Sequence, residues 1–129
     1  MSASPGHATR SASDFSSHGT RCSGWLCLPE GRALPPVVVM AHGFGAEKTF
    51  RLPAFAERFA AEGMAVYLFD YRCFGGSDGQ PRHLIDPRRQ VQDWQAAVSH
   101  VRTLPGIDHR RMALWGVSFS GGHVLVVAS

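Results

Sequence analysis

The chain has 129 residues, of which 44% are hydrophobic, 10% aromatic and 18% charged; this composition supplies a packed core and excludes a disordered protein. Its net charge is +3, and its basic residues are nearly all arginines scattered along the sequence. The pairs Arg88-Arg89 and Arg110-Arg111 lack interleaved aromatic residues, so the charge pattern indicates a solvated surface and no nucleic-acid partner.

The first segment, residues 1–13, consists mainly of small polar residues, and we predict a disordered tail there. A transit peptide would show the same shortage of acids together with Arg10, but a plain tail is the commoner origin of such a terminus. The segment lacks the charged-then-apolar pattern of a signal peptide. No apolar run approaches the roughly 20 residues that span a bilayer, so we expect no membrane span.

The three cysteines are Cys22, Cys27 and Cys73, an odd number without a CxxC pair. They predict neither a disulfide framework nor a zinc site. This cysteine usage fits a reducing compartment, and we expect a cytoplasmic protein.

From Asp14 onward the sequence predicts a single ordered domain, residues 14–129. Phe15, the turn-like pair His18-Gly19 and the apolar residues up to Leu28 indicate an antiparallel hairpin at its start. Short apolar runs after it are typical of strands buried on both faces of a parallel sheet, and apolar residues at three- and four-residue steps predict helices between them. The strands are expected at Val37–Ala41, Met64–Phe69 and Met112–Trp115, and the helices at Leu52 to Gly63, Asp86-Pro87 to Leu104, and Ser118 to the end. Asp86 is the predicted N-cap of the second helix, and Pro87 lies in its first turn.

Strands that alternate with helices predict an α/β fold, with a mostly parallel sheet covered by helices on both faces. Chemistry in such sheets lies at the carboxyl ends of the strands. The loop from Trp115 to Gly122 joins a strand to a helix there and places Ser118 at the apex of the turn. A turn this tight needs small residues two positions before and after the serine, which are Gly116 and Ser120 in this sequence. We therefore interpret the loop as a nucleophile elbow.

Two earlier loops strengthen this interpretation. The segment His42-Gly43-Phe44-Gly45 resembles the HG loop of α/β-hydrolases, and the segment from Asp70 to Asp78 is similar to their D-x-R-G-x-G-x-S-D loop, with Cys73 in place of a glycine. The resemblance covers roughly Asp14 to Ser129 and is nearest to the serine aminopeptidase-like and dienelactone-hydrolase-like branches. It implies an α/β-hydrolase fold, of which this chain would be the N-terminal part.

The resemblance also implies a mechanism, in which Ser118 attacks an ester, thioester or amide carbonyl and water later hydrolyses the acyl-enzyme. Backbone N–H groups of Phe44 and Phe119 would form the oxyanion hole. The expected partner is a small-molecule acyl substrate or a short peptide, and the family pattern calls for neither a cofactor nor a metal ion.

The triad of this family runs in the order Ser, then Asp or Glu, then His, and only eleven residues follow Ser118. His123 is expected to point away from the turn, His42 to hold the shape of its loop, and Asp70 to anchor the loop after its strand. The catalytic acid and base are therefore expected beyond residue 129, in a chain truncated after the elbow. Whether the chain is itself an enzyme stays open. The alternative is an inactive hydrolase-like remnant or binding module.

A phosphate-binding site is disfavoured, because Glu47 stands where a P-loop has the glycine before its lysine. The dinucleotide fingerprint fails in the same loop, because Lys48 stands where that motif needs a glycine or alanine.

Overall fold

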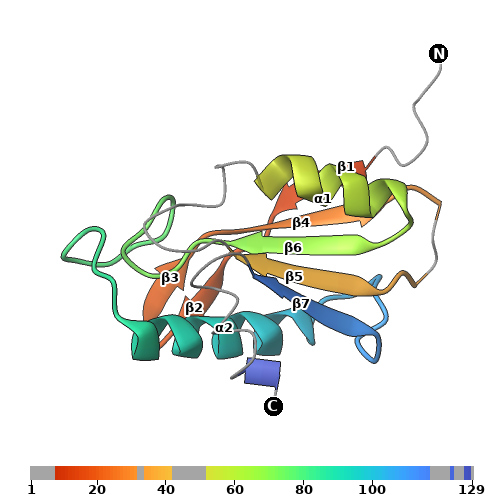
Figure 1. The fold of residues 1–129 in the computed structure, drawn as a ribbon. Coiled ribbons are helices and arrows are strands. Elements are labelled where there is room, and N and C mark those ends of the chain that lie inside the picture. The colour runs from red at the N-terminus through yellow and green to blue at the C-terminus, as the bar shows by residue number, and fades with distance from the viewer. Residues whose placement is uncertain (1–7, 32–33, 42–51, 117–122, 124–126, 129) are drawn as a thin grey trace.

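The chain forms a five-stranded mixed sheet with a helix on each face and a separate two-stranded hairpin (Figure 1). The computed structural model describes residues 8–31, 34–41, 52–116, 123, 127 and 128. The sheet has the order β1-β4-β6-β5-β7, and the hairpin pairs β2 with β3. The elements are β1 (Ala8–Ala12), β2 (Phe15–Ser17), β3 (Thr20–Cys22), β4 (Gly24–Pro29), β5 (Val37–Ala41), α1 (Leu52–Ala61), β6 (Ala65–Phe69), α2 (Pro87–Val101) and β7 (Met112–Gly116).

The three strands predicted from apolar runs form the parallel part of the sheet. β5 pairs in parallel with β6 on one side and with β7 on the other. β4 and β1 then extend the sheet in antiparallel fashion beyond β6. The prediction of a mostly parallel α/β sheet is confirmed for its centre. The hairpin predicted around His18-Gly19 is confirmed as β2–β3, but the apolar residues from Trp25 to Leu28, which the sequence places in it, belong to β4 of the main sheet.

Both faces of the central strands carry apolar side chains, which explains why these strands read as continuous apolar runs. On one face, Val39, Tyr67 and Phe69 pack with Trp94 of α2 in a buried cluster. On the other, Met40 and Leu68 pack in a second cluster with Ala56 of α1. The two helices therefore cover opposite faces, as the alternation of strands and helices predicts.

The first strand differs from the sequence-based expectation. β1 lies within the segment 1–13, for which the composition predicts a disordered tail, and it pairs with β4 from Ala8↔Pro29 to Ala12↔Trp25. An edge strand can be held by backbone hydrogen bonds along one side, so it needs no apolar run to join a sheet. Ordered structure thus begins by Ala8, and residues 1–7 lie outside the described residues.

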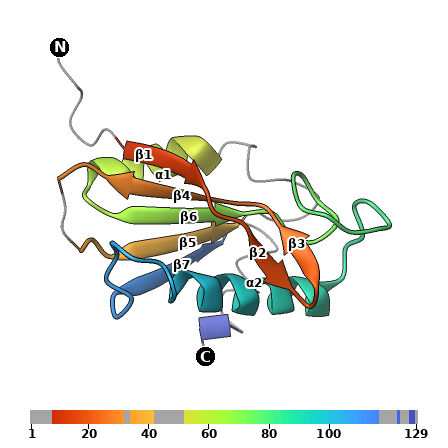
Figure 2. The ribbon, with the colours of Figure 1, turned by 180° about the vertical axis from the view of Figure 1, so that it is seen from behind.

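The hairpin β2–β3 sits against α2, and Figure 2 shows the two side by side. Ser17 of β2 donates a hydrogen bond to Asp93 of α2 at 2.7 Å, and Ser13 lies 2.9 Å from the Nε2 of His100. Asp86 caps the start of α2 by accepting from the backbone N–H groups of Arg88 and Arg89, which confirms the predicted N-cap. The helix predicted from Ser118 onward lies mostly outside the described residues.

Candidate functional site at the carboxyl edge of the sheet

Three loops leave the parallel strands at one edge of the sheet, because β5, β6 and β7 run in the same direction. Two of them, residues 42–51 and 117–122, lie outside the described residues, and with them Phe44, Ser118 and Phe119. The third loop, residues 70–79 after β6, is described throughout. We refer to it as the glycine-rich loop.

Asp70 anchors the glycine-rich loop to the end of β6. Its Oδ2 accepts a hydrogen bond from the N–H of Gly76 at 3.0 Å, and its carbonyl accepts one from the hydroxyl of Ser77 at 2.7 Å. A Cβ on Gly75, which has φ +52°, would collide with the Asp70 carboxylate. The predicted role of Asp70 as a loop anchor is confirmed, and the position of Gly75 requires glycine.

Cys73 stands in the loop where the family pattern has a glycine. Its φ of 77° lies in the left-handed region that glycine adopts most easily, and its side chain is buried. Two backbone hydrogen bonds hold this residue. Its N–H donates to the carbonyl of Asp78 at 2.9 Å, and its carbonyl accepts from the backbone N–H of His83 at 2.8 Å. The sequence departs from the family here, and the backbone keeps the conformation that a glycine would favour.

Arg72 and Asp93 form a buried ion pair that joins the loop to α2. The Nε of Arg72 lies 2.5 Å from Oδ1 of Asp93, and its backbone N–H donates to Oδ2 at 2.9 Å. Both side chains are almost fully enclosed, with exposed fractions of 5% and 1%. Ser17 supplies a third donor to this carboxylate. Burial raises the pKa of Asp93, while the hydrogen bonds from Ser17 and Arg72 oppose that rise.

The role of Asp93 is not predictable from the sequence. The residue lies on the helix face that includes Trp94, and its partners Ser17 and Arg72 are 76 and 21 residues away in the chain. The one available signal is an acid on a helix face that is apolar apart from Gln90, because a buried carboxylate requires partners.

His123 lies against α2. Its Nε2 is 2.9 Å from the side-chain oxygen of Gln90, and its ring meets that of Tyr71 edge to face at 6.1 Å. Burial lowers the pKa of His123, so the neutral form is favoured. The contact with Gln90 places His123 against α2, while its relation to Ser118 lies outside the described residues.

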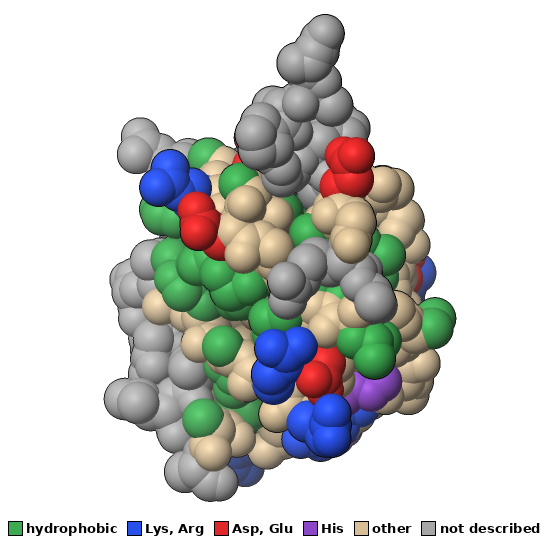
Figure 3. Space-filling view, turned by 90° about the vertical axis from the view of Figure 1, so that its right-hand side faces the viewer, with side chains coloured by type: hydrophobic (Ala, Val, Ile, Leu, Met, Phe, Trp, Pro, Cys, Tyr) green, Lys and Arg blue, Asp and Glu red, His purple; other side chains and the backbone are tan. Residues whose placement is uncertain are grey.

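Charges on the opposite edge of the sheet, where β7 begins, are interspersed by sign (Figure 3). Arg110 and Arg111 both pair with Asp108, at 3.3 and 2.9 Å. The hydrogen bonds from Arg110 and Arg111 hold the pKa of Asp108 below its ordinary value. This arginine pair is therefore partly neutralised rather than part of a basic patch.

All three cysteines are buried free thiols, and burial raises the pKa of Cys22 to about 12. Among the described residues, no three His, Cys, Asp or Glu side chains lie close enough together to hold a metal ion. No helix in the described part of the chain is long and apolar enough to cross a bilayer.

Comparison with known proteins agrees with the fold and the order of the loops. The family model "Serine aminopeptidase, S33" matches residues 34–129. The quorum-quenching protein AidA of Acinetobacter baumannii is 50% identical over 115 residues, which cover 89% of this chain and 38% of that protein. The thiohydrolase aneE of Aspergillus aculeatus is 44% identical over 110 residues, covering 85% of this chain and 34% of its own length.

A solved structure is similar over the same region. The crystal structure of the α/β-hydrolase GrgF from Penicillium superposes with a TM-score of 0.86 at 35% identity, covering 93% of this chain and 41% of that one. The architecture is thus that of the N-terminal part of an α/β-hydrolase. The chain spans between about a third and two fifths of the length of these relatives.

Proposed function

Because the chain belongs to the serine aminopeptidase S33 family of α/β-hydrolases, we propose that the protein is a serine hydrolase in which Ser118 is the nucleophile. Ser118 attacks the carbonyl of an acyl substrate, and the acyl-enzyme is then hydrolysed by water. The acid and histidine that activate the serine are contributed by chain beyond residue 129.

The observation that carries this proposal is the position of Gly116. This residue ends β7, next to the central strand β5 and at the edge where all three parallel strands terminate. Ser118 follows it by two residues in the sequence Gly116-Val117-Ser118-Phe119-Ser120. A serine at this distance from the end of a parallel strand, before an expected helix, fits a nucleophile elbow.

The oxyanion hole is assigned to the backbone N–H groups of Phe44 and Phe119. Phe44 lies three residues after Ala41, the last residue of β5, so both donors come from neighbouring strand ends. Such donors stabilise the negative oxygen of the tetrahedral intermediate, and losing one typically costs about 3 to 4 kcal/mol. No metal ion or cofactor is needed for this chemistry.

The substrate class that we propose is a small-molecule ester or thioester. One relative is a thiohydrolase by name, and that relative is 44% identical over most of this chain. Amides and short peptides are the alternative within the same mechanism, since they pass through the same tetrahedral intermediate.

Labelling with a fluorophosphonate probe tests the nucleophile in the protein expressed from its own gene with native termini. We expect labelling of the wild type and none of Ser118→Ala. Hydrolysis of a p-nitrophenyl ester should fall by about 10⁴-fold or more in the same variant, because the remaining site lacks the attacking group.

Ser99→Ala is the matched control, since Ser99 lies exposed on α2 and loses the same hydroxyl. It should label like the wild type. If soluble, folded wild-type protein does not react with the probe, the hydrolase proposal fails and the alternative, an inactive remnant or binding module, takes its place.

A further inference from the structure

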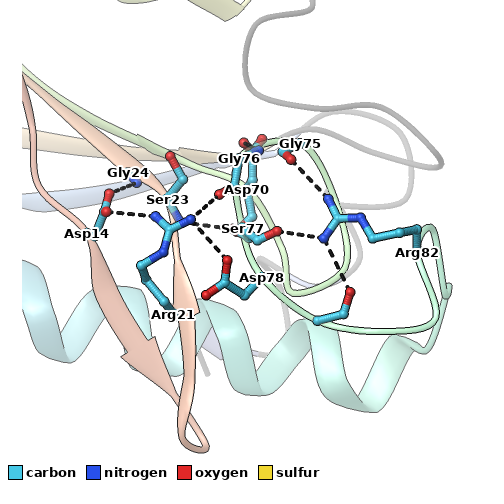
Figure 4. A network of polar contacts seen from close by, with 11 residues as sticks. Asp14, Arg21, Ser23, Gly24, Asp70, Gly75, Gly76, Ser77, Asp78 and Arg82 are labelled. Carbon is cyan, nitrogen blue, oxygen red and sulfur yellow. Dashed lines mark hydrogen bonds and ion pairs between the residues drawn. The ribbon is translucent and has the colours of Figure 1, made fainter.

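The glycine-rich loop is held through its backbone carbonyls. From Gly75 to Gly79 every carbonyl accepts a hydrogen bond, and all but one of the donors are arginine side chains (Figure 4). Arg82 donates to the carbonyls of Gly75, Ser77 and Gly79 at 2.9, 2.7 and 3.2 Å. Arg21 donates to that of Gly76 at 2.6 Å. The backbone conformation of the loop is therefore specified residue by residue.

The two arginines differ in what they connect. Arg82 lies within seven residues of each of its partners, so it closes the loop on itself. Arg21 lies 55 residues before Gly76, in β3, and so ties the loop to the N-terminal hairpin. The backbone carbonyl of Arg21 also accepts from the N–H of Asp78 at 2.9 Å. The side chain of Arg21 therefore helps to fix the loop tip relative to β3, together with the N–H of Ser23, which donates to the hydroxyl of Ser77 just after that strand.

Two carboxylates orient the Arg21 guanidinium. Nη1 lies 2.8 Å from Asp14, and Nη2 lies 3.1 Å from Asp78. Asp14 in turn accepts from the N–H of Gly24, so it is itself fixed at the base of the hairpin. The guanidinium thus bridges Asp14, at the base of the hairpin, and two residues of the loop, Gly76 and Asp78.

The loop lies where it can border a substrate bound at Ser118. It leaves β6, and β5 separates β6 from β7, the strand that leads to Ser118. Neighbouring strands are about 4.8 Å apart, so the exits of β6 and β7 are roughly 10 Å apart, a distance that an acyl chain of about eight carbons spans. Arg21 is half exposed and holds the loop from the hairpin side.

We propose that Arg21 is a positioning residue, which fixes the glycine-rich loop as one wall of the acyl-binding site. The effect of Arg21 on substrate binding rests on the proposed function. The restraint that Arg21 places on the loop does not depend on that function. Loss of Arg21 leaves the serine and its oxyanion donors in place and loosens the wall. Substrate binding should weaken, while the chemical step is largely retained.

Kinetics on Arg21→Gln in the protein with native termini test this, with p-nitrophenyl octanoate as the substrate, because its acyl chain is long enough to reach the loop from Ser118. We expect KM to rise about fivefold, in line with the loss of one exposed charged contact network, and kcat to stay within about twofold of the wild type. Arg21→Lys should recover part of the loss, because an ammonium group can reach the Gly76 carbonyl or one carboxylate. Arg110→Gln, which breaks an exposed ion pair at the far edge of the sheet, should leave both constants unchanged.

Hydrogen exchange gives a readout that needs no activity. In Arg21→Gln, amides of residues 70–79 should exchange faster, while those of β5 and β7 keep their protection. If KM and loop exchange both match the wild type, or if protection falls evenly throughout the sheet, the positioning role is overturned. An inactive wild type with selectively faster loop exchange in the variant would remove the hydrolase proposal and leave the loop restraint standing.

Discussion

Cys73 is a non-glycine residue at φ 77°, in a loop position that is buried and hydrogen-bonded on both sides. A side chain in the left-handed region costs about 1 to 2 kcal/mol relative to glycine. Cys73→Gly and Cys73→Ala both remove the sulfur that packs against Gly79, so they differ mainly in this backbone strain. We expect the glycine variant to be more stable than the alanine variant by about 1 kcal/mol, measured by denaturant unfolding.

Position 99 supplies the comparison. Ser99 lies exposed in the last turn of α2, where alanine should still be more stable than glycine by about 0.5 kcal/mol. The glycine variant should therefore be the more stable one at position 73, and the alanine variant the more stable one at position 99. If Cys73→Ala is as stable as Cys73→Gly, the loop leaves the left-handed conformation without a loss of stability, and the strain at position 73 is overturned.

At the scale of elements, Asp93 couples α2, the hairpin and the glycine-rich loop through one carboxylate. Asp93→Ala leaves the buried Arg72 guanidinium without its counter-charge, although Arg72 keeps its contacts with the Arg89 carbonyl and the Gln92 side chain. Removing one partner of a buried ion pair typically costs about 3 to 5 kcal/mol. We expect a loss of that size in the free energy of unfolding, which chemical denaturation would measure.

The hydrogen bond that the hairpin donates to Asp93 can be removed without touching the ion pair. Ser17→Ala removes one neutral donor to Asp93 and should cost about 1 kcal/mol. If Asp93→Ala costs no more than Ser17→Ala, the ion pair contributes little beyond an ordinary hydrogen bond, and the coupling of the three elements through Asp93 is wrong.

These elements also show what the sequence can predict. The apolar run Val37–Ala41 and the cap at Asp86 were predictable, because each depends on neighbours within a few residues. The contacts of Arg21 with Gly76 and of Ser17 with Asp93 were not, because they join residues 55 and 76 positions apart whose polarity alone indicates only a surface. β1 was missed for a similar reason, since its pairing with β4 depends on backbone groups that every sequence possesses. For the candidate site, the motifs predicted Ser118, Phe44 and Phe119, which stay predictions.

For the molecule as a whole, two histidines link folding to pH: His100, which is half-buried, and His123, which is buried. Burial lowers the pKa of His100, an effect that the charge of Asp14 opposes, and burial lowers that of His123. The unfolded chain therefore binds protons near pH 6.5 that the folded chain binds only at lower pH. Stability contributed by both groups is complete above that value and is lost as the pH falls through the folded pKa values.

We accordingly expect the free energy of unfolding to decrease on acidification from pH 7.5 to 5.5, measured by denaturant titration at each pH. His100→Gln should reduce this pH dependence while keeping a polar partner for Ser13, because it removes one of the two protonation sites. His109→Gln, which changes an exposed histidine, is the control and should follow the wild type. Asp93 works in the opposite direction, because its raised pKa favours proton uptake by the folded state at low pH. A stability that is constant or rises on acidification over this range would show that the two histidines do not control the acid response.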